Sequence, residues 1–280
     1  MDTRTAHPLL AEDGPPRAAA MIVTIYGDVV DPRGGSLWMG DLIDLCAKLG
    51  LSETLVRTAV SRLVTAGQLE GTRQGRRSCY ALTADARVEY RVAAEQIYGP
   101  PNNTRGWSWL ISPDEPDEAT TEGFAHLGGG LWLAPGQRTN GNAGGSVMHA
   151  TALGDATALA KLALRHWELD RHSSAYSRFL ARFAPLEQDA PSTLEPDLAL
   201  TMRLSLVHAY RHAVLRDPHL PVEALPPDWP AARARALFSK LYLALTPAAE
   251  RAIAASLSAR NGPLESATDL SQARLEQLRA

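Results

Sequence analysis

The chain has little cysteine, no long apolar run and no excess of positive charge. Its 280 residues include only two cysteines, Cys46 and Cys79, too few for the disulfide framework of a small secreted protein. No segment approaches the run of about 20 apolar residues that a membrane-spanning helix needs. The apolar stretch 18–26 is short, and acidic residues precede it where a signal peptide would be basic. We therefore expect a cytoplasmic protein that makes no contact with a membrane.

The net charge of −3 excludes a general binder of polyanions, which would be basic overall. Any contact with nucleic acid must then come from a local patch. Residues 52–80 form such a patch, because they hold five arginines against two acidic residues and so carry +3, which leaves −6 for the rest of the chain. This concentration of positive charge is typical of a DNA-binding module.

The N-terminal third follows the pattern of a helix-turn-helix. An apolar helix is expected over residues 18–30, and Ser36 is placed to cap a second helix that Gly50 ends. Ser52 is placed to cap a third helix, which Gly67 ends. Two short amphipathic helices joined by a tight turn that contains glycine are typical of this motif. An apolar stripe on the third helix is expected to face the core, and it consists of Leu55, Ala59, Val60, Leu63 and Val64.

The opposite face of the third helix is polar and basic. Two short strands around a turn at Gln74 and Gly75 follow it, and a hairpin in this place is a wing. Arginine can bond guanine with two hydrogen bonds, and hydroxyl groups can reach base edges or phosphates. We therefore expect the following residues to contact duplex DNA: Thr54, Arg57, Thr58, Ser61 and Arg62 on the helix, and Arg73, Arg76 and Arg77 on the hairpin. The alternatives are a solvated polar face and a winged helix that binds protein.

The rest of the chain is expected to be α+β and mostly helical. A connecting helix is expected over 84–98, strands near 107–111, 130–133 and 146–150, and a helical segment near 117–127 between them. From about residue 156 onward the pattern is helical, with breaks at prolines, and Pro247 is expected at the first position of a helix. The expected divisions are a disordered tail (1–17), a winged helix-turn-helix domain (18–98), a central unit (99–153) and a C-terminal helical domain (154–280).

Other site chemistry is weak in this sequence. His208 and His212 have the spacing of a metal-binding pair, but no further metal motif supports them, so a metal site is not expected. No phosphate-binding loop or nucleophile motif is present, and we expect neither catalysis nor a cofactor. Residues 215–230 read as a proline-stiffened connection between helices. A cleft for an effector ligand is the alternative, and its candidate residues are Arg203, Tyr210, Arg211, Arg216 and Trp229.

Four segments resemble the PaaX family, repressors of bacterial phenylacetate catabolism. They are TIYGDVVDPRGGSLWMGDLI, LSETLVRTAVSRLVTAGQLEGTRQGRRSCYALT, FAHLGGGLWLAPG and YRHAVLRDPHLPVEALPPDWP. The resemblance implies an N-terminal winged helix-turn-helix, a central ferredoxin-like unit of the kind seen in small CRISPR-associated nucleases, and a C-terminal helical domain that serves dimerisation and effector binding. It also implies a homodimer that represses from palindromic operator DNA and is released by an aryl-CoA thioester, typically phenylacetyl-CoA.

Two other functions stay open at this point. The first is a regulator of the same build that responds to a different acyl-CoA or to an aromatic acid. The second is an enzyme or nuclease with an appended winged helix. A metal-dependent nuclease needs carboxylates that converge on rigid elements, whereas the acidic residues of the central segment are expected on a loop. These residues are Asp114, Glu115, Asp117 and Glu118.

Overall fold

The computed structural model describes residues 17–101, 104–112, 123–138, 145–151, 156–187 and 194–279. Within these ranges the chain is α+β and mostly helical, as the sequence predicts. The helices are α2 (Ala18–Ile25), α3 (Met39–Lys48), α4 (Glu53–Thr65), α5 (Ala84–Tyr98), α7 (Ala156–His166), α8 (Leu169–Phe183), α9 (Pro196–Val214), α10 (Ala231–Ser256) and α11 (Asp269–Arg279). The strands are β1 (Ser36–Trp38), β2 (Leu69–Gln74), β3 (Arg77–Leu82), β4 (Trp107–Ile111), β5 (Ala125–Gly128), β6 (Leu131–Pro135), β7 (Ser146–Ala150), β8 (Ser258–Ala259) and β9 (Gly262–Pro263).

The chain divides into two compact units that interleave in sequence. The first unit comprises residues 1–100, 178–215 and 233–280, and the second comprises 101–177 and 216–232. The expected boundary at residue 99 lies beside the observed one. The segment 154–280, expected as one domain, contributes residues to both units.

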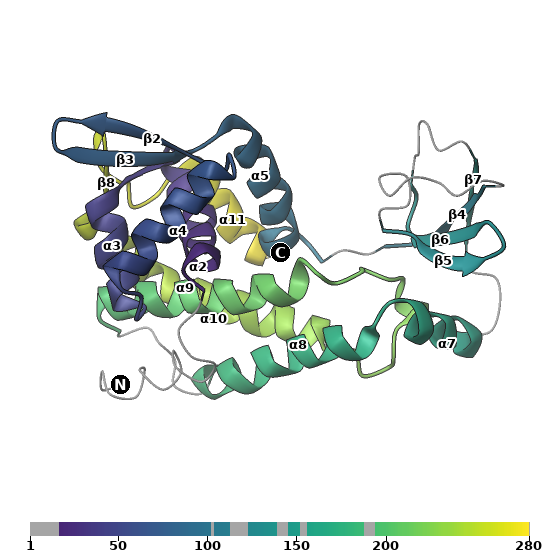
Figure 1. Ribbon diagram of the computed structural model, residues 1–280. Helices are drawn as coiled ribbons and strands as arrows, with labels where there is room; N and C mark the ends of the chain where they lie inside the picture. The colour runs from purple at the N-terminus through teal and green to yellow at the C-terminus, as the bar shows by residue number, and fades with distance from the viewer. Residues whose placement is uncertain are drawn as a thin grey trace. The chain divides into compact units, whose positions relative to one another are not determined.

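Helix α2 lies in the middle of the first unit, between α4 and α9 (Figure 1). Because it is apolar on nearly all sides, it can be surrounded by other helices, and Met21, Ile22 and Ile25 are buried. The expected helix over 18–30 is confirmed, although its last five residues, Tyr26–Val30, form a π-helical turn. Asp28 lies in this turn and is almost completely buried.

A small antiparallel sheet with the strand order β1-β3-β2 follows α2 in the same unit. Ser36, expected to cap a helix, instead begins β1, and α3 starts only at Met39. The reason is that residues 36–38 pair with β3 before the chain turns into the helix. The turn between β2 and β3 is Gly75-Arg76 rather than Gln74-Gly75, since Gln74 pairs with Arg77.

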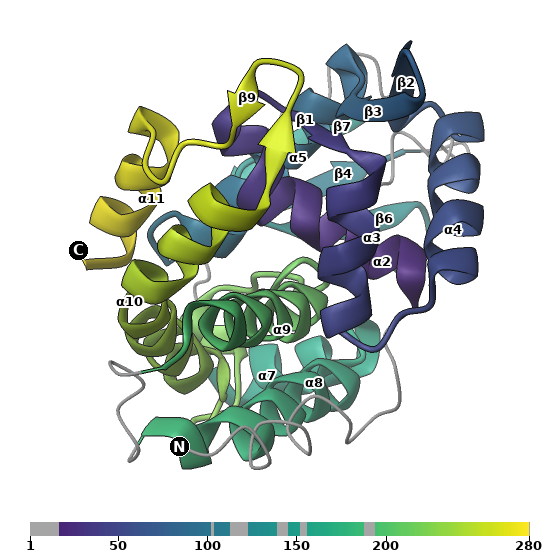
Figure 2. The same cartoon turned by 90° about the vertical axis from the view of Figure 1, so that its left-hand side faces the viewer.

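Helix α10 runs unbroken through Pro247, where a new helix was expected to begin. Proline inside a helix removes one backbone hydrogen bond and costs about 3 kcal/mol, but apolar residues on both sides of Pro247 are buried and hold the helix together. Beyond α10 the chain is not purely helical, because β8 and β9 form a two-stranded hairpin before α11. Figure 2 shows this hairpin beside β1.

The second unit contains a four-stranded sheet in the order β5-β6-β4-β7, and every neighbouring pair is antiparallel. The three expected strands are confirmed. The prediction of a helical segment near 117–127 is wrong at its C-terminal end, because residues 125–127 belong to β5. Side-chain burial alternates along β5, as in a half-buried strand. Residues 113–122, with the four acidic residues named above, lie outside the described residues.

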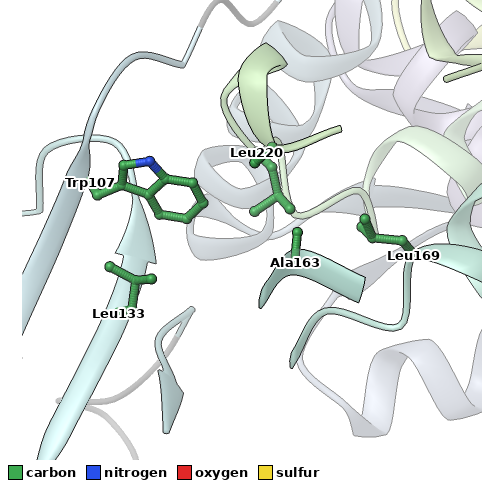
Figure 3. Close-up of a cluster of buried hydrophobic side chains, with 6 residues drawn as sticks. Trp107, Leu133, Ala163, Leu169 and Leu220 are labelled. Atoms are coloured by element: carbon green, nitrogen blue, oxygen red, sulfur yellow. The ribbon is translucent and has the colours of Figure 1, made fainter. Parts of the chain in front are cut away.

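One face of this sheet forms the core of the second unit (Figure 3). Trp107 of β4 and Leu133 of β6 pack with Ala163 of α7, with Leu169 at the start of α8 and with Leu220. The segment 215–230 therefore contributes residues to the core of the second unit, as expected for a structural connection between helices.

Candidate nucleic-acid interface

Helix α4 separates a buried face from an exposed one. Ser52 occupies the cap position, but its side chain accepts no capping hydrogen bond. The buried face consists of Val56, Ala59, Val60 and Leu63. Two members of the expected apolar stripe lie outside it, since Leu55 is 52% exposed and Val64 38% exposed. The helix is thus rotated slightly from the predicted orientation, and Leu55 joins the polar face.

All five residues predicted for this helix, Thr54, Arg57, Thr58, Ser61 and Arg62, are exposed. The Arg57 guanidinium contacts Glu53 one turn earlier at 2.7 Å. Such an exposed pair contributes roughly 0.5 kcal/mol or less, so a phosphate or base can displace it at little cost. The Thr58 hydroxyl donates to the carbonyl of Thr54 at 2.9 Å and can still accept a hydrogen bond.

The β2–β3 hairpin projects three arginines that have different surroundings. Gly75 adopts φ +60° at the first position of the two-residue turn, which favours glycine there, and Arg76 follows it at the tip. Arg73 donates to the carbonyl of Gly75 at 3.2 Å. Arg77 directly follows the tip, and its guanidinium lies 4.3 Å from the centroid of the Trp38 ring and 3.9 Å from Asp41. All three side chains are exposed.

The base of this surface is fixed by a contact that the sequence analysis missed. Asp41, in the first turn of α3, accepts hydrogen bonds from the backbone N–H of Ser258 at 2.8 Å and from its hydroxyl at 2.6 Å. The indole of Trp38 donates to the carbonyl of Ala259. No local pattern signals a contact across more than 200 residues, so only the structure could find it.

Arg203, predicted to border an effector cleft, is instead buried inside the first unit with 0% of its surface exposed. Its Nε lies 3.1 Å from Asp28 Oδ2, and its Nη1 lies 2.7 Å from Glu250 Oε1. Glu250 also pairs with Arg33, and Tyr98 and Tyr242 each donate to Asp28 at 2.8 Å. This placement corrects the expectation, because the guanidinium is held by internal carboxylates and is closed to a soluble ligand.

The charges in this buried network support each other. Burial alone would favour a neutral Asp28, but the charge of Arg203, with help from Arg274 and the two tyrosine hydroxyls, holds its pKa below the ordinary value. Burial and the negative charge of Asp28 raise the pKa of Tyr98 far above its usual range. At neutral pH Asp28 is therefore a carboxylate and Arg203 a guanidinium, and the phenols of Tyr98 and Tyr242 are un-ionised.

The other effector candidates are divided between the two units. Tyr210 is buried and stacks on Phe238 with ring centroids 4.1 Å apart, so it is a core residue. Arg211 donates to the carbonyl of Ala20 at 3.1 Å and thereby joins α9 to α2. In the second unit Arg216 is exposed, and the ring of Trp229 lies 6.2 Å from that of Tyr176. These residues thus have different surroundings within their own units.

The described residues contain no group of three His, Cys, Asp or Glu side chains that could hold a metal ion. Both cysteines are buried and unpaired, and burial raises the pKa of Cys46 to about 12, so its thiol stays neutral. No helix within the described ranges combines the length and the apolar character that crossing a bilayer requires.

Comparisons with known proteins identify the family of this chain. Residues 17–86 match the family described as PaaX-like protein, and residues 167–255 match the PaaX-like protein C-terminal domain. The chain is 32% identical over 276 residues to the transcriptional repressor PaaX of Escherichia coli strain K12, and the match covers 89% of this chain and 86% of that protein. The fold resembles that of an uncharacterised protein from Mycobacterium tuberculosis, with a TM-score of 0.52 and 24% identity over 82% of this chain and 97% of that one. The chain therefore belongs to the PaaX family, a family of transcriptional repressors and not of enzymes.

Proposed function

We propose that this protein is a transcriptional repressor that binds operator DNA through α4 and the β2–β3 hairpin, acting as a winged helix-turn-helix. One observation carries the proposal: the exposed face of α4 and the following hairpin present five arginines beside three hydroxyl side chains. These residues are Thr54, Arg57, Thr58, Ser61, Arg62, Arg73, Arg76 and Arg77. Arginine and hydroxyl groups suit base edges and phosphates, and their concentration in an acidic protein gives a local positive field.

The arrangement of elements supports this reading of the first unit. Helices α3 and α4 pack together, only four residues separate them, and the hairpin follows α4 directly. Strand β1 completes a three-stranded sheet with that hairpin. A recognition helix that leads into a twisted hairpin can enter the major groove while the hairpin reaches the neighbouring backbone.

The strand order of the second unit supports a ferredoxin-like interpretation. Strand β6 forms a hairpin with β5 and inserts beside β4, and β7 pairs with the other edge of β4. If β4 to β7 are counted as strands one to four, their order across the sheet is 2-3-1-4. This is the strand order of a ferredoxin-like split βαβ unit.

Anisotropy titrations of the purified protein test the DNA interface. The probe is a 30-base-pair duplex that the protein itself selects from a random library. We expect Arg57→Ala and Arg76→Ala each to weaken binding, and Arg76→Ala to lower the salt slope by about 0.9 if it contacts one phosphate. Arg233→Ala is the matched control, because Arg233 is an exposed arginine at the distant start of α10. Unchanged affinity in both test variants would refute the proposed DNA interface.

We extend the proposal to control by a ligand. A homodimer would place two α4 helices in successive major grooves, about 34–36 Å apart on a palindromic operator. An effector that binds better to a dimer of the wrong spacing lowers operator occupancy. The resemblance to a phenylacetate regulator makes phenylacetyl-CoA the first candidate. Of the five residues first considered, Arg203 and Tyr210 are buried and Arg211 is bonded to α2, so Arg216 and Trp229 are the better candidates for a ligand contact.

Thermal-shift and DNA-release measurements test the effector. The panel contains phenylacetyl-CoA, acetyl-CoA, free CoA and phenylacetate. We expect phenylacetyl-CoA alone to raise the melting temperature and to release the selected duplex. Release by another compound of the panel would show that the protein is a regulator of the same type with a different effector. No response to any compound would refute control by these ligands. Analytical ultracentrifugation tests the dimer directly.

A further inference from the structure

A groove lies beside the β2–β3 hairpin, between it and the β8–β9 hairpin near the C-terminus. Its volume is about 430 Å³. We call it the hairpin groove, and it is lined by Trp38, Gln74, Arg77, Ser258, Ala259, Arg260, Gly262 and Pro263. All of these residues belong to the first unit. Figure 2 shows β9 and the β1–β3 region on the same side of that unit.

The β8–β9 wall of the groove is held firmly against the DNA-binding module. Asp41 binds the backbone N–H and the hydroxyl of Ser258, and Trp38 binds the carbonyl of Ala259. Strands β8 and β9 pair with each other through Ser258–Pro263 and Ala259–Gly262. Arg260, the residue after Ala259, thus stands at the turn of a short hairpin whose base is anchored.

The two walls present arginines that suit an anion. Arg77 forms one wall and lies over Trp38, and Arg260 forms the other. Arg260 is exposed, and within the described part of the chain its guanidinium has no hydrogen-bond or ion-pair partner. Arg76 extends the same positive surface at the adjacent tip. A free guanidinium beside a second one is repelled by its neighbour and is stabilised by a phosphate.

We propose that the hairpin groove holds the phosphate backbone of the operator at the edge of the site, and that Arg260 contacts a phosphate there. The inference rests on the proposed function and extends the interface to a segment near the other end of the chain. The positive walls suit DNA rather than an acidic protein because they continue the surface of the β2–β3 hairpin, which is itself proposed to follow the duplex. A backbone contact of this kind adds affinity and orientation but carries no base preference.

Parallel salt titrations of the wild type, Arg76→Gln, Arg260→Gln, Arg260→Lys and Arg233→Gln test the inference, with the selected duplex and a mixed-sequence duplex of equal length as probes. We expect Arg260→Gln to lower the salt slope by about 0.9 and to weaken binding about eightfold at 0.1 M salt on both duplexes. Arg260→Lys keeps the charge and should retain most of the affinity. Arg233→Gln should match the wild type, because Arg233 lies roughly 35 Å away along α10 by helical rise.

The outcomes separate the two proposals. If the wild type binds and Arg76→Gln weakens it while Arg260→Gln does not, the groove contact is wrong and the DNA interface stands. If the wild type shows no salt-dependent binding, the proposed function fails. Because Arg260 is exposed, its substitution should leave the melting temperature unchanged, and loss of binding with loss of stability would point to a structural role instead.

Discussion

The indole Nε1 of Trp38 donates a hydrogen bond of 2.9 Å to the carbonyl of Ala259, which is 221 residues further along the chain. Beside it, Asp41 binds Ser258 through two more hydrogen bonds. Strand β1 and helix α3, which pack against the hairpin and α4 of the proposed DNA interface, are therefore fixed by the segment that leaves α10. Substitutions that break these contacts should therefore lower the free energy of unfolding.

Replacement of Asp41 by alanine should lower the free energy of unfolding by about 1–3 kcal/mol, because the part-buried N–H of Ser258 loses its acceptor. Asp41→Asn keeps one acceptor oxygen and should cost less. Urea denaturation measures both variants. Asp44→Ala is the control, since Asp44 is exposed on the same helix and should stay within about 0.5 kcal/mol of the wild type. Equal losses in Asp41→Ala and Asp44→Ala would contradict the contact.

Substitution of Val56 by alanine should lower the stability of the protein much more than the same substitution of its neighbour Leu55. Val56 is fully buried, so Val56→Ala should destabilise the protein by about 1–3 kcal/mol. Leu55 is half exposed on the polar face of α4, so Leu55→Ala should change stability by less than about 0.5 kcal/mol. If its methyl groups contact a thymine methyl, Leu55→Ala should weaken the selected duplex more than a mixed-sequence one. Denaturation and anisotropy together measure this; a stability loss in Leu55→Ala equal to that in Val56→Ala would refute the placement.

Removal of Arg203 should be among the most damaging single changes. Arg203→Met leaves the buried Asp28 without its ion-pair partner, and breaking a buried pair in this way costs about 3–5 kcal/mol. The double variant Arg203→Met with Asp28→Asn removes both charges of that pair and should recover part of the loss. Arg216→Met is the control, since Arg216 is exposed. A double variant no more stable than Arg203→Met would argue against the pair.

His208 should make stability depend on pH. Burial, followed by the charges of Arg211, His212 and Arg182, lowers its pKa from 6.5 to about 4. Below pH 6.5 the unfolded chain gains a proton at this site that the folded protein does not take up until about pH 4, so stability should fall across this window and level off below it. The loss from this residue is roughly 3 kcal/mol at most.

Denaturation of the wild type and of His208→Gln between pH 4.5 and 7 measures this effect, and the variant should show the smaller slope. An NMR titration gives the pKa of the imidazole directly. A midpoint near 6.5 would show that His208 is not buried as described.

Features specified locally were the ones that the sequence predicted well. Glycines end α3 and α4, and a Gly75 turn with flanking apolar residues gives the β2–β3 hairpin, so these elements follow from short segments. The sequence predicted the orientation of α4 less well. Leu55 and Val56 are neighbours around the helix axis, and a small rotation of the helix decides which of the two is buried. The pairing of Ser36–Trp38 with β3 depends on a strand about 40 residues away, and a helix cap was predicted there instead.

Long-range contacts account for the remaining differences. Arg203 looks the same in the sequence as an exposed arginine, since its partner Asp28 is 175 residues away. Its burial depends on the meeting of α9, α10 and the π-helical turn, which no local pattern specifies. The anchoring of the β8–β9 hairpin by Trp38 and Asp41 was missed for the same reason.

The buried position of Asp28 has a consequence for protein engineering. A truncated protein that ended at residue 98 would retain α4 and its arginines, but Asp28 would lose both Arg203 and Tyr242. We therefore expect the N-terminal segment to be less stable when it is separated from the rest of the chain or grafted onto another regulator. An exchange of operator preference between relatives should transfer the exposed side chains of α4 and leave the helices beneath them in place.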